Sequence, residues 1–266
     1  MHLVVDNLSL EFSRSGSGPS MLWGHGLTSS MANEDKRALW SLAEPVNGAG
    51  FELIRYDARG HGRSEGRAVA DDYTWANLAN DAVALFDALA SSPTDQWVIG
   101  GASMGAATML HVATTRADLV RAMVLMIPPT AWETRANQRA LYAGAAKFIT
   151  EKGSAAYVAA SHRLPPLPIF DAAGKGELMR SEPDIEEVFL PFVLTGAGNS
   201  DLPSPDAIRD LRMPTLILAW DTDPGHPVST AERLAELLPN KTLHVARTFD
   251  EITTWPNLIG EFLRLL

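Results

Sequence analysis

The segment from Trp97 to Met109, WVIGGASMGAATM, constrains the fold of this chain more than any other. An apolar run leads into Gly101, Ser103 and Gly105, and small helix-forming residues follow. This order predicts a strand, a sharp turn and a helix, with the serine in the turn. The two glycines let the strand and helix backbones approach each other closely. Ser103 is therefore expected to present its hydroxyl to a bound substrate.

Strands alternate with helices along most of the chain. We expect strands at residues 3–13, 20–23, 51–56, 97–100, 120–127, 214–220 and 242–246, and helices at 73–89, 106–115, 134–152, 230–238 and 250–266. Alternation of this kind predicts the α/β class, with a mostly parallel central sheet that helices cover on both faces.

Residues 130–212 interrupt the alternation. They begin as a helix, continue through the proline-rich run LPPLP at 164–168, and follow the end of a predicted strand. A segment inserted there lies over the ligand site of an open α/β sheet. The sequence thus predicts a core of residues 1–129 and 213–266 and a helical cap of residues 130–212. Its large apolar residues, which either line the pocket or pack the cap onto the core, are Trp132, Tyr142, Phe148, Tyr157, Ile169, Phe170, Phe189 and Phe192.

The composition excludes several classes of function. The formal net charge of -10 argues against a nucleic-acid partner, because phosphate contacts need clustered lysine and arginine. The chain has no cysteine, which excludes disulfides, thiolate catalysis and cysteine-ligated zinc. Neither a signal peptide nor a long apolar run is evident, so we expect a cytoplasmic protein without a membrane partner. The sequence leaves open whether the chain forms a homodimer.

Two more motifs accompany the serine turn. The strand MLWGHGL ends in His25 and Gly26, and the strand that begins at Phe51 ends in DARGHGRS at residues 57–64. With these three motifs in order, the chain resembles the α/β-hydrolase superfamily, in particular its serine esterases and enol-lactone hydrolases. The resemblance implies the α/β-hydrolase fold and a serine nucleophile, with no metal and no organic cofactor.

The resemblance also implies how an oxyanion would be stabilised. In this superfamily two backbone N–H groups bind it, and they fall here on Leu27, which follows the His-Gly pair, and on Met104, which follows the nucleophile. His25 is expected to brace its loop. His61 is likewise expected to be structural, with Arg59 supporting the same turn.

Serine hydrolases of this superfamily use a triad of serine, histidine and an acidic residue. The acidic residue is expected here after the strand PTLILAW. The turn there reads Asp221-Thr222-Asp223-Pro224, and the usual position in the family falls on Asp223, with Asp221 in reserve. Some relatives carry the acid after the preceding strand, where this chain offers only Glu133, several residues late.

The histidine departs from the family pattern. The family places it after the last strand, but that stretch reads HVARTFDE, and His244 would lie within the strand. His226, three residues past Asp223, is the candidate base that could accept the Ser103 proton. The alternative is that His226 caps the helix beginning near Pro227 or lines the pocket. His162 in the cap is a further candidate.

Three functions follow from this sequence. The first is a serine hydrolase of a small carboxylic ester or lactone, with an acyl-enzyme on Ser103 and a rate that falls below about pH 6.5 as the imidazole is protonated. The second is cofactor-free lyase or oxygenase chemistry in the same pocket. The third is a hydrolase-like protein that binds a small molecule with weak or no turnover, and the missing histidine is its main support.

Overall fold

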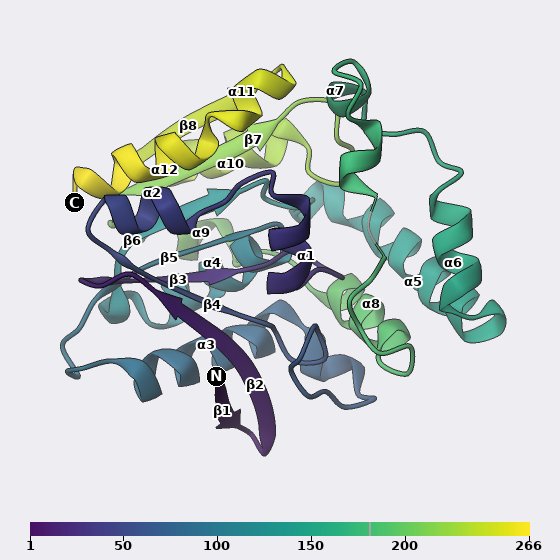
Figure 1. The fold of residues 1–266 in the computed structure, drawn as a ribbon, viewed down its shortest axis with the longest axis horizontal. Helices are drawn as coiled ribbons and strands as arrows, with labels where there is room; N and C mark the ends of the chain where they lie inside the picture. Colours follow the sequence, from purple (N-terminus) through teal and green to yellow (C-terminus); the bar gives the residue numbers. More distant parts are fainter. Residues whose placement is uncertain (181) are drawn as a thin grey trace.

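The computed structural model describes residues 1–180 and 182–266 (Figure 1). Within these residues, eight strands form one sheet in the order β1-β2-β4-β3-β5-β6-β7-β8. Strand β2 is antiparallel to β1 and β4, and the neighbours from β4 to β8 are parallel. The strands are β1 (His2–Val5), β2 (Leu8–Ser15), β3 (Ser20–Gly24), β4 (Glu52–Tyr56), β5 (Trp97–Ala102), β6 (Val120–Met126), β7 (Thr215–Trp220) and β8 (Lys241–Ala246).

Helices connect the parallel strands, as a parallel sheet requires. They are α1 (Met31–Arg37), α2 (Ala43–Gly48), α3 (Trp75–Leu89), α4 (Met104–Thr115), α5 (Arg135–Lys152), α6 (Ser154–Ser161), α7 (Pro168–Asp171), α8 (Leu190–Asn199), α9 (Pro205–Arg209), α10 (Val228–Leu237), α11 (Phe249–Thr253) and α12 (Trp255–Arg264). Short 3₁₀ turns lie at Ala70–Tyr73, Ala117–Leu119, Trp132–Thr134 and Gly176–Met179.

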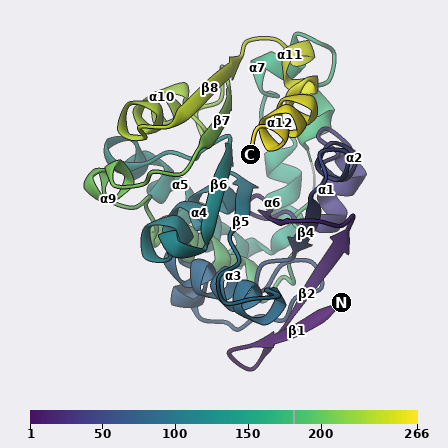
Figure 2. The same cartoon turned by 90° about the vertical axis from the view of Figure 1, so that its left-hand side faces the viewer.

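The sheet separates two hydrophobic cores. Helices α3, α4, α9 and α10 cover one face, and α2, α11 and α12 cover the other (Figure 2). Because strand side chains alternate between faces, Ile217 of β7 packs in the first core while Leu216 and Leu218 pack in the second. Burial on both faces confirms the α/β class and the mostly parallel sheet expected from the sequence.

Two expected elements are each divided in the structure. The single strand expected at 3–13 is wrong, because Asp6 and Asn7 turn the chain with φ angles of 51° and 61° and make a hairpin of β1 and β2. The single helix expected at 250–266 is two helices, α11 and α12. Pro256 lies in the first turn of α12, where its missing N–H costs nothing.

The inserted segment, residues 130–212, contributes α5, α6, α7, α8 and α9 between β6 and β7, and Ile208 of α9 packs in the first core of the sheet. Helices α5, α6 and α8 gather on one side of the molecule, beside the sheet (Figure 1). Arg135 at the start of α5 joins the first and last of these helices, because it donates to the carbonyls of Ala197 and Ser200. Among the residues described, no helix combines the length and apolarity needed to cross a membrane.

Candidate active site

Ser103 occupies a strained turn between β5 and α4. Its φ of 53° and ψ of -108° are unusual for a residue with a side chain, and such a conformation costs about 1–3 kcal/mol. Small neighbours make the turn possible. A Cβ atom on Gly105 would lie 2.0 Å from the carbonyl oxygen of Gly24, and one on Gly101 would lie 2.5 Å from the carbonyl carbon of Gly105. The strand–turn–helix predicted for this segment is confirmed.

We expect Gly105→Ala to lower the free energy of unfolding by more than about 3 kcal/mol, because the added methyl group meets rigid backbone. Urea denaturation followed by circular dichroism measures this. Gly144→Ala is the matched control: it lies within α5 with open space around it and should stabilise by about 0.5–1 kcal/mol. Similar small effects of both changes would contradict the tight approach at Gly105.

Three side chains form a hydrogen-bonded chain at this turn. The hydroxyl oxygen of Ser103 lies 2.7 Å from Nε2 of His226, and Nδ1 of His226 lies 2.8 Å from Oδ2 of Asp223. A carboxylate only accepts, so Nδ1 carries the imidazole hydrogen and Nε2 is left to accept the Ser103 proton. This is the tautomer that a general base needs.

The turn after β7 holds both His226 and Asp223, three residues apart. The Asp223 carboxylate also accepts hydrogen bonds from the Gly225 amide at 2.9 Å and the Trp220 indole at 2.9 Å. Burial raises the pKa of Asp223, but His226 and these two donors outweigh it and lower that pKa to about 2. The carboxylate therefore remains charged down to strongly acidic pH.

Trp220 is itself fixed by other aromatic rings. It stacks on Trp255 with ring centroids 5.6 Å apart and lies 5.8 Å from the ring of Trp40. Phe170 of the insertion meets its edge at 5.1 Å. The indole that orients Asp223 thus cannot easily turn away.

Within the described residues, none of the other candidates for the base or the acid forms a hydrogen bond with Ser103 or His226. His244 lies within β8, as expected, with an exposed side chain, and α11 begins soon afterwards at Phe249. His162 is exposed and lies along a surface groove outside the Ser103 cavity. Asp221, the reserve acid, is exposed and accepts from the amide of Thr222. A further histidine, His111 of α4, is partly buried, and its Nε2 lies 2.9 Å from the carbonyl oxygen of Asp201.

The His-Gly loop lies directly against Ser103. A Cβ atom on Gly26 would come within 3.8 Å of the Ser103 Cβ, and Leu27 lines the same cavity as Ser103. Met104 is the first residue of α4, whose opening N–H groups have no partner within the helix. The two residues whose amides are expected to bind an oxyanion, Leu27 and Met104, therefore lie next to Ser103.

His25 braces this loop as a neutral ring. Its Nδ1 donates to the carbonyl of Gly26 at 2.8 Å, and its Nε2 accepts from the amide of Ala58 at 3.0 Å. Burial lowers the pKa of His25 to about 4, although the bond to Gly26 raises it. His61 packs against it with ring centroids 5.0 Å apart. Both histidines are structural, in keeping with the sequence analysis.

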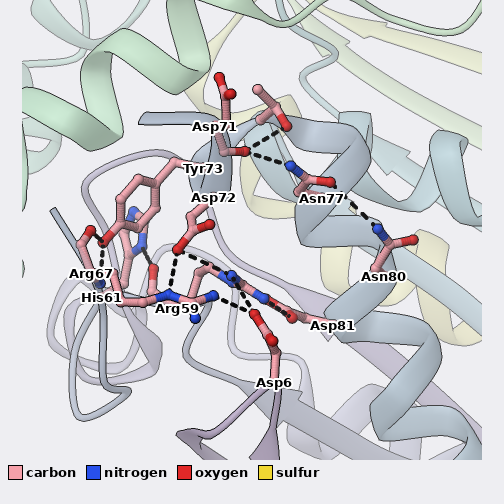
Figure 3. Close-up of polar contacts among 11 residues, drawn as sticks. Asp6, Arg59, His61, Arg67, Asp71, Asp72, Tyr73, Asn77, Asn80 and Asp81 are labelled. Carbon is pink, nitrogen blue, oxygen red and sulfur yellow. Dashed lines mark hydrogen bonds and ion pairs between the residues drawn. The ribbon is translucent and has the colours of Figure 1, made fainter. Parts of the chain in front are cut away.

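An ionic network, buried at Arg59 and Asp81 and exposed at Asp6 and Arg67, anchors the turn that supports His25 (Figure 3). Arg59 donates two hydrogen bonds to Asp81 of α3, at 2.6 and 2.5 Å. It also lies 3.5 Å from Asp72 and 3.7 Å from Asp6, and Arg67 binds the same two carboxylates. The network joins the β1–β2 turn to α3 and fixes the backbone beneath the His-Gly loop.

The cavity at Ser103 has a volume of about 290 Å³. Of the large apolar residues noted in the insertion, Tyr142 and Tyr157 line it. Phe170 is buried in the core instead, and Phe148 is 39% exposed. The lining residues include Leu27, Ser29, Glu34, Arg37, Trp40, Ile127, Tyr142, Tyr157, Met179, Leu194 and His226.

Sequence reasoning missed the cavity wall formed by α1 and by Trp40, which follows it. Glu34, Arg37 and Trp40 follow the His-Gly motif, and no helix was expected there. A signal was present, since Ser30 caps the helix by accepting from the amide of Asn33, and Lys36 and Arg37 lie in its last turn.

Comparisons with known proteins agree with this architecture. The sequence model of the family described as "Serine aminopeptidase, S33" matches residues 24–249, which include Ser103, Asp223 and His226. This chain is an α/β-hydrolase of that family. It is also 30% identical, over 74% of its own length and 72% of the relative's, to a putative carbamate hydrolase, RutD, of Caulobacter sp. (strain K31).

Solved α/β-hydrolase structures share the fold. An enol-lactonase from Burkholderia xenovorans LB400 superposes with a TM-score of 0.78 at 17% identity, covering 99% of both chains. A thermophilic esterase from Thermogutta terrifontis gives 0.74 at 21% identity, covering 100% of this chain and 98% of its own. At these identities the likeness establishes the fold alone.

Proposed function

We propose that this protein is a serine hydrolase of small carboxylic esters or lactones, with Ser103 as nucleophile, His226 as general base and Asp223 as its orienting acid. The observation that carries the proposal is the continuous hydrogen-bonded chain from Ser103 through His226 to Asp223, at 2.7 and 2.8 Å. Both the base and its acid come from one turn, in place of the family's histidine after the last strand.

Acylation begins as the Ser103 oxygen attacks the substrate carbonyl while His226 Nε2 takes its proton. The carbonyl oxygen becomes an oxyanion, which accepts hydrogen bonds from the amides of Leu27 and Met104. When the tetrahedral intermediate collapses, the bond to the alcohol oxygen breaks, and His226 returns the proton to that oxygen. The acyl group stays on Ser103 as an ester.

Deacylation repeats these steps with water. His226 removes a proton from a water molecule that attacks the acyl-enzyme, and the same oxyanion contacts stabilise the second tetrahedral intermediate. The bond to the Ser103 oxygen then breaks, and His226 returns the proton to that oxygen. Throughout both half-reactions the Asp223 carboxylate stabilises the positive charge that forms on His226.

The segment 130–212 serves as the cap of this site. Tyr142, Tyr157 and Leu194 from this segment line the cavity together with Ser103. The cavity suits a small organic substrate, and water excluded by the cap would strengthen the oxyanion contacts. An enol-lactonase and an esterase among the structural neighbours, and a relative named as a putative carbamate hydrolase, all concern carbonyl hydrolysis.

A binding protein without turnover is less well supported. Its main argument was the missing histidine, and His226 Nε2 lies within hydrogen-bond distance of the Ser103 hydroxyl. A pure binding site has no need of this tautomer or of a charged Asp223 behind it.

Covalent labelling tests the proposed nucleophile. A fluorophosphonate probe should label the wild-type protein rapidly, and peptide mass spectrometry should place the adduct on Ser103. The activated serine is required, so Ser103→Ala should abolish labelling and His226→Ala should slow it strongly. If esters are hydrolysed while Ser103 stays unlabelled, another nucleophile is responsible and the proposal is wrong.

A further inference from the structure

Residues 182–185 of the inserted segment are hydrogen-bonded to two loops of the core. The backbone amide of Asp184 donates to the carbonyl of Thr28 at 3.0 Å. The carbonyl of Asp184 accepts from the amide of Gly62 at 2.8 Å. This part of the inserted segment is thus fastened both to the His-Gly loop and to the turn at residues 57–64.

The side chain of Asp184 binds the His-Gly loop a second time, 154 positions away in the chain. The hydroxyl of Ser30 donates to Oδ2 of Asp184 at 2.5 Å, and its oxygen accepts from the amide of Asn33 at 3.0 Å to cap α1. Ser30 is fully buried, and hydrogen bonds to a carboxylate are stronger than those between neutral groups. Loss of the carboxylate would leave this buried hydroxyl without its acceptor, which is unfavourable.

The loop that Asp184 binds is strained. Thr28 has a φ of 59°, in the left-handed region that a β-branched side chain rarely adopts. The amide of Ser29 donates to the carbonyl of Gly26 at 3.1 Å and closes a tight turn around Thr28. A conformation of this kind persists only where surrounding contacts hold it. The hydrogen bond from Asp184 to the Thr28 carbonyl is one such contact.

This turn fixes the direction of the Leu27 amide, one of the two proposed oxyanion donors. The carbonyl of Gly26 accepts from the amide of Ser29 and from Nδ1 of His25. Because the peptide unit is planar and trans, the N–H of Leu27 points away from that carbonyl oxygen. An oxyanion donor is effective only when it is aimed at the place the oxyanion will occupy. Any rotation of this peptide unit therefore weakens the donor.

Apolar contacts join the same loop to the inserted segment. The side chain of Leu27 packs against a hydrophobic cluster from α5 and α8, as does Ile185, the residue that follows Asp184. The buried members of this cluster are Ala146, Ile149, Leu190 and Leu194. The position of the Leu27 backbone thus depends on the inserted segment through both packing and hydrogen bonds.

We propose that Asp184 is a positioning residue for the oxyanion hole, because through Thr28 and Ser30 it fixes the turn that presents the Leu27 amide. This inference rests on the proposed hydrolase function, since it concerns the same oxyanion. Asp184 itself lies along a surface groove outside the Ser103 cavity, so it acts on the reaction only through the loop. The inserted segment then sets the geometry of catalysis as well as covering the cavity.

Hydrolysis of 4-nitrophenyl acetate measures the effect. Asp184→Ala should lower kcat and kcat/KM equally, by at least about tenfold, because the aim of the donor matters only in the transition state. The loss should stay below the roughly 10²–10³-fold that follows deletion of an oxyanion donor. Asp184→Asn keeps an acceptor oxygen for Ser30 and should retain most of the rate. Glu186→Ala removes an exposed carboxylate nearby and should leave the rate unchanged.

Variants of Ser30 test the route from Asp184 to the loop. Ser30→Ala removes the donor to the carboxylate and should cost about as much as Asp184→Ala, while Ser30→Thr keeps the hydroxyl and should recover most of the rate. The double variant Asp184→Ala/Ser30→Ala should be little slower than either single one. Losses that multiply would contradict the route through Ser30. If Asp184→Ala fails to fold, the pair Ser30→Ala and Ser30→Thr decides the question.

A pair of inhibitors separates aim from general damage to the cavity. Trifluoromethyl butyl ketone should accept the Ser103 oxygen at its carbonyl carbon, with the serine proton passing to His226 and the ketone oxygen becoming an oxyanion. Methyl butyl ketone should bind without this addition. Asp184→Ala should raise the Ki of the first about tenfold or more and leave that of the second within about twofold. A merely structural role would weaken both inhibitors alike.

Hydrogen–deuterium exchange distinguishes failure of this inference from failure of the hydrolase proposal. In the Ser103→Ala protein, Asp184→Ala should speed exchange of the Ser29 amide, which closes the turn, and Glu186→Ala should not. Faster exchange supports the hold of Asp184 on the loop even if the wild type hydrolyses no ester. If the wild type is active and Asp184→Ala changes neither kcat, nor the ratio of the two Ki values, nor the exchange, this inference is wrong while the hydrolase proposal stands.

Discussion

His226→Ala is expected to lower kcat toward an activated ester by at least about 10³-fold, nearly as much as Ser103→Ala. The reason is that serine and histidine act as one unit: without the imidazole that lies 2.7 Å from its hydroxyl, Ser103 keeps its proton and attacks poorly. Stopped-flow or steady-state hydrolysis of 4-nitrophenyl acetate, corrected for the buffer rate, measures the loss.

The double variant distinguishes a unit from two independent contributions. Ser103→Ala/His226→Ala should be only slightly slower than either single variant, since the second change removes a partner that no longer has a function. Residual hydrolysis above the buffer rate is expected, because the Leu27 and Met104 amides remain. Losses that multiply in the double variant would show that His226 and Ser103 act separately.

The other histidines provide controls for this prediction. His162→Ala and His244→Ala remove rings that lie away from the Ser103 cavity, so both variants should retain the wild-type rate. A large loss in His162→Ala with little loss in His226→Ala would transfer the general base to the cap and overturn the assignment made here.

Asp223→Asn is expected to lower kcat by roughly 10⁴-fold while the protein stays folded. Asp223 accepts from Gly225 at one oxygen and from Trp220 and His226 at the other. The NH₂ group of an asparagine would replace one of these two oxygens, so it must face either the Gly225 amide or the pair of Trp220 and His226. If it faces His226, the imidazole must carry its hydrogen on Nε2 and can no longer accept the serine proton.

Asp221→Asn is the matched control for Asp223→Asn. It lies on the same turn, but its side chain is exposed and accepts only from the amide of Thr222 among the bonds seen here. Its kcat should stay within about twofold of wild type, as is usual for an exposed surface position. Equal losses in both variants would mean that the turn responds to any change of charge. A loss confined to Asp221→Asn would make that residue the acid.

Much of the architecture could be predicted from local sequence patterns. The strand–turn–helix around Ser103 is encoded by residues next to one another, since Gly101 and Gly105 are needed wherever two backbones come this close. The long apolar strands could also be predicted from residues that are adjacent in the sequence. Burial on both faces of a parallel sheet selects continuous apolar runs. The β1–β2 hairpin was missed because its turn uses Asp6 and Asn7 without the glycine that usually signals one.

Other features depended on contacts between distant segments. The sequence named His226 as one candidate among several, and it did not name Ser29, Glu34 or Arg37 as residues of the cavity at all. The α1 wall lies against Ser103 because β3 and β5 are neighbours in the sheet, although α1 and Ser103 are far apart in the chain. Likewise only Tyr142 and Tyr157 among the insertion's large apolar residues reach the cavity, which periodicity alone could not decide.

The sequence by itself therefore determined the class of fold, the strained serine turn and the acidic turn after β7, because steric and hydrophobic requirements act over a few adjacent residues. Only the tertiary structure decided which imidazole reaches the Ser103 hydroxyl and which side chains of α1 line the cavity. Both outcomes depend on distances across the sheet: the first on the distance from Ser103 to His226, the second on the distance from Ser103 to α1. Such distances are set by how β3, β5 and β7 lie beside one another and not by any local pattern.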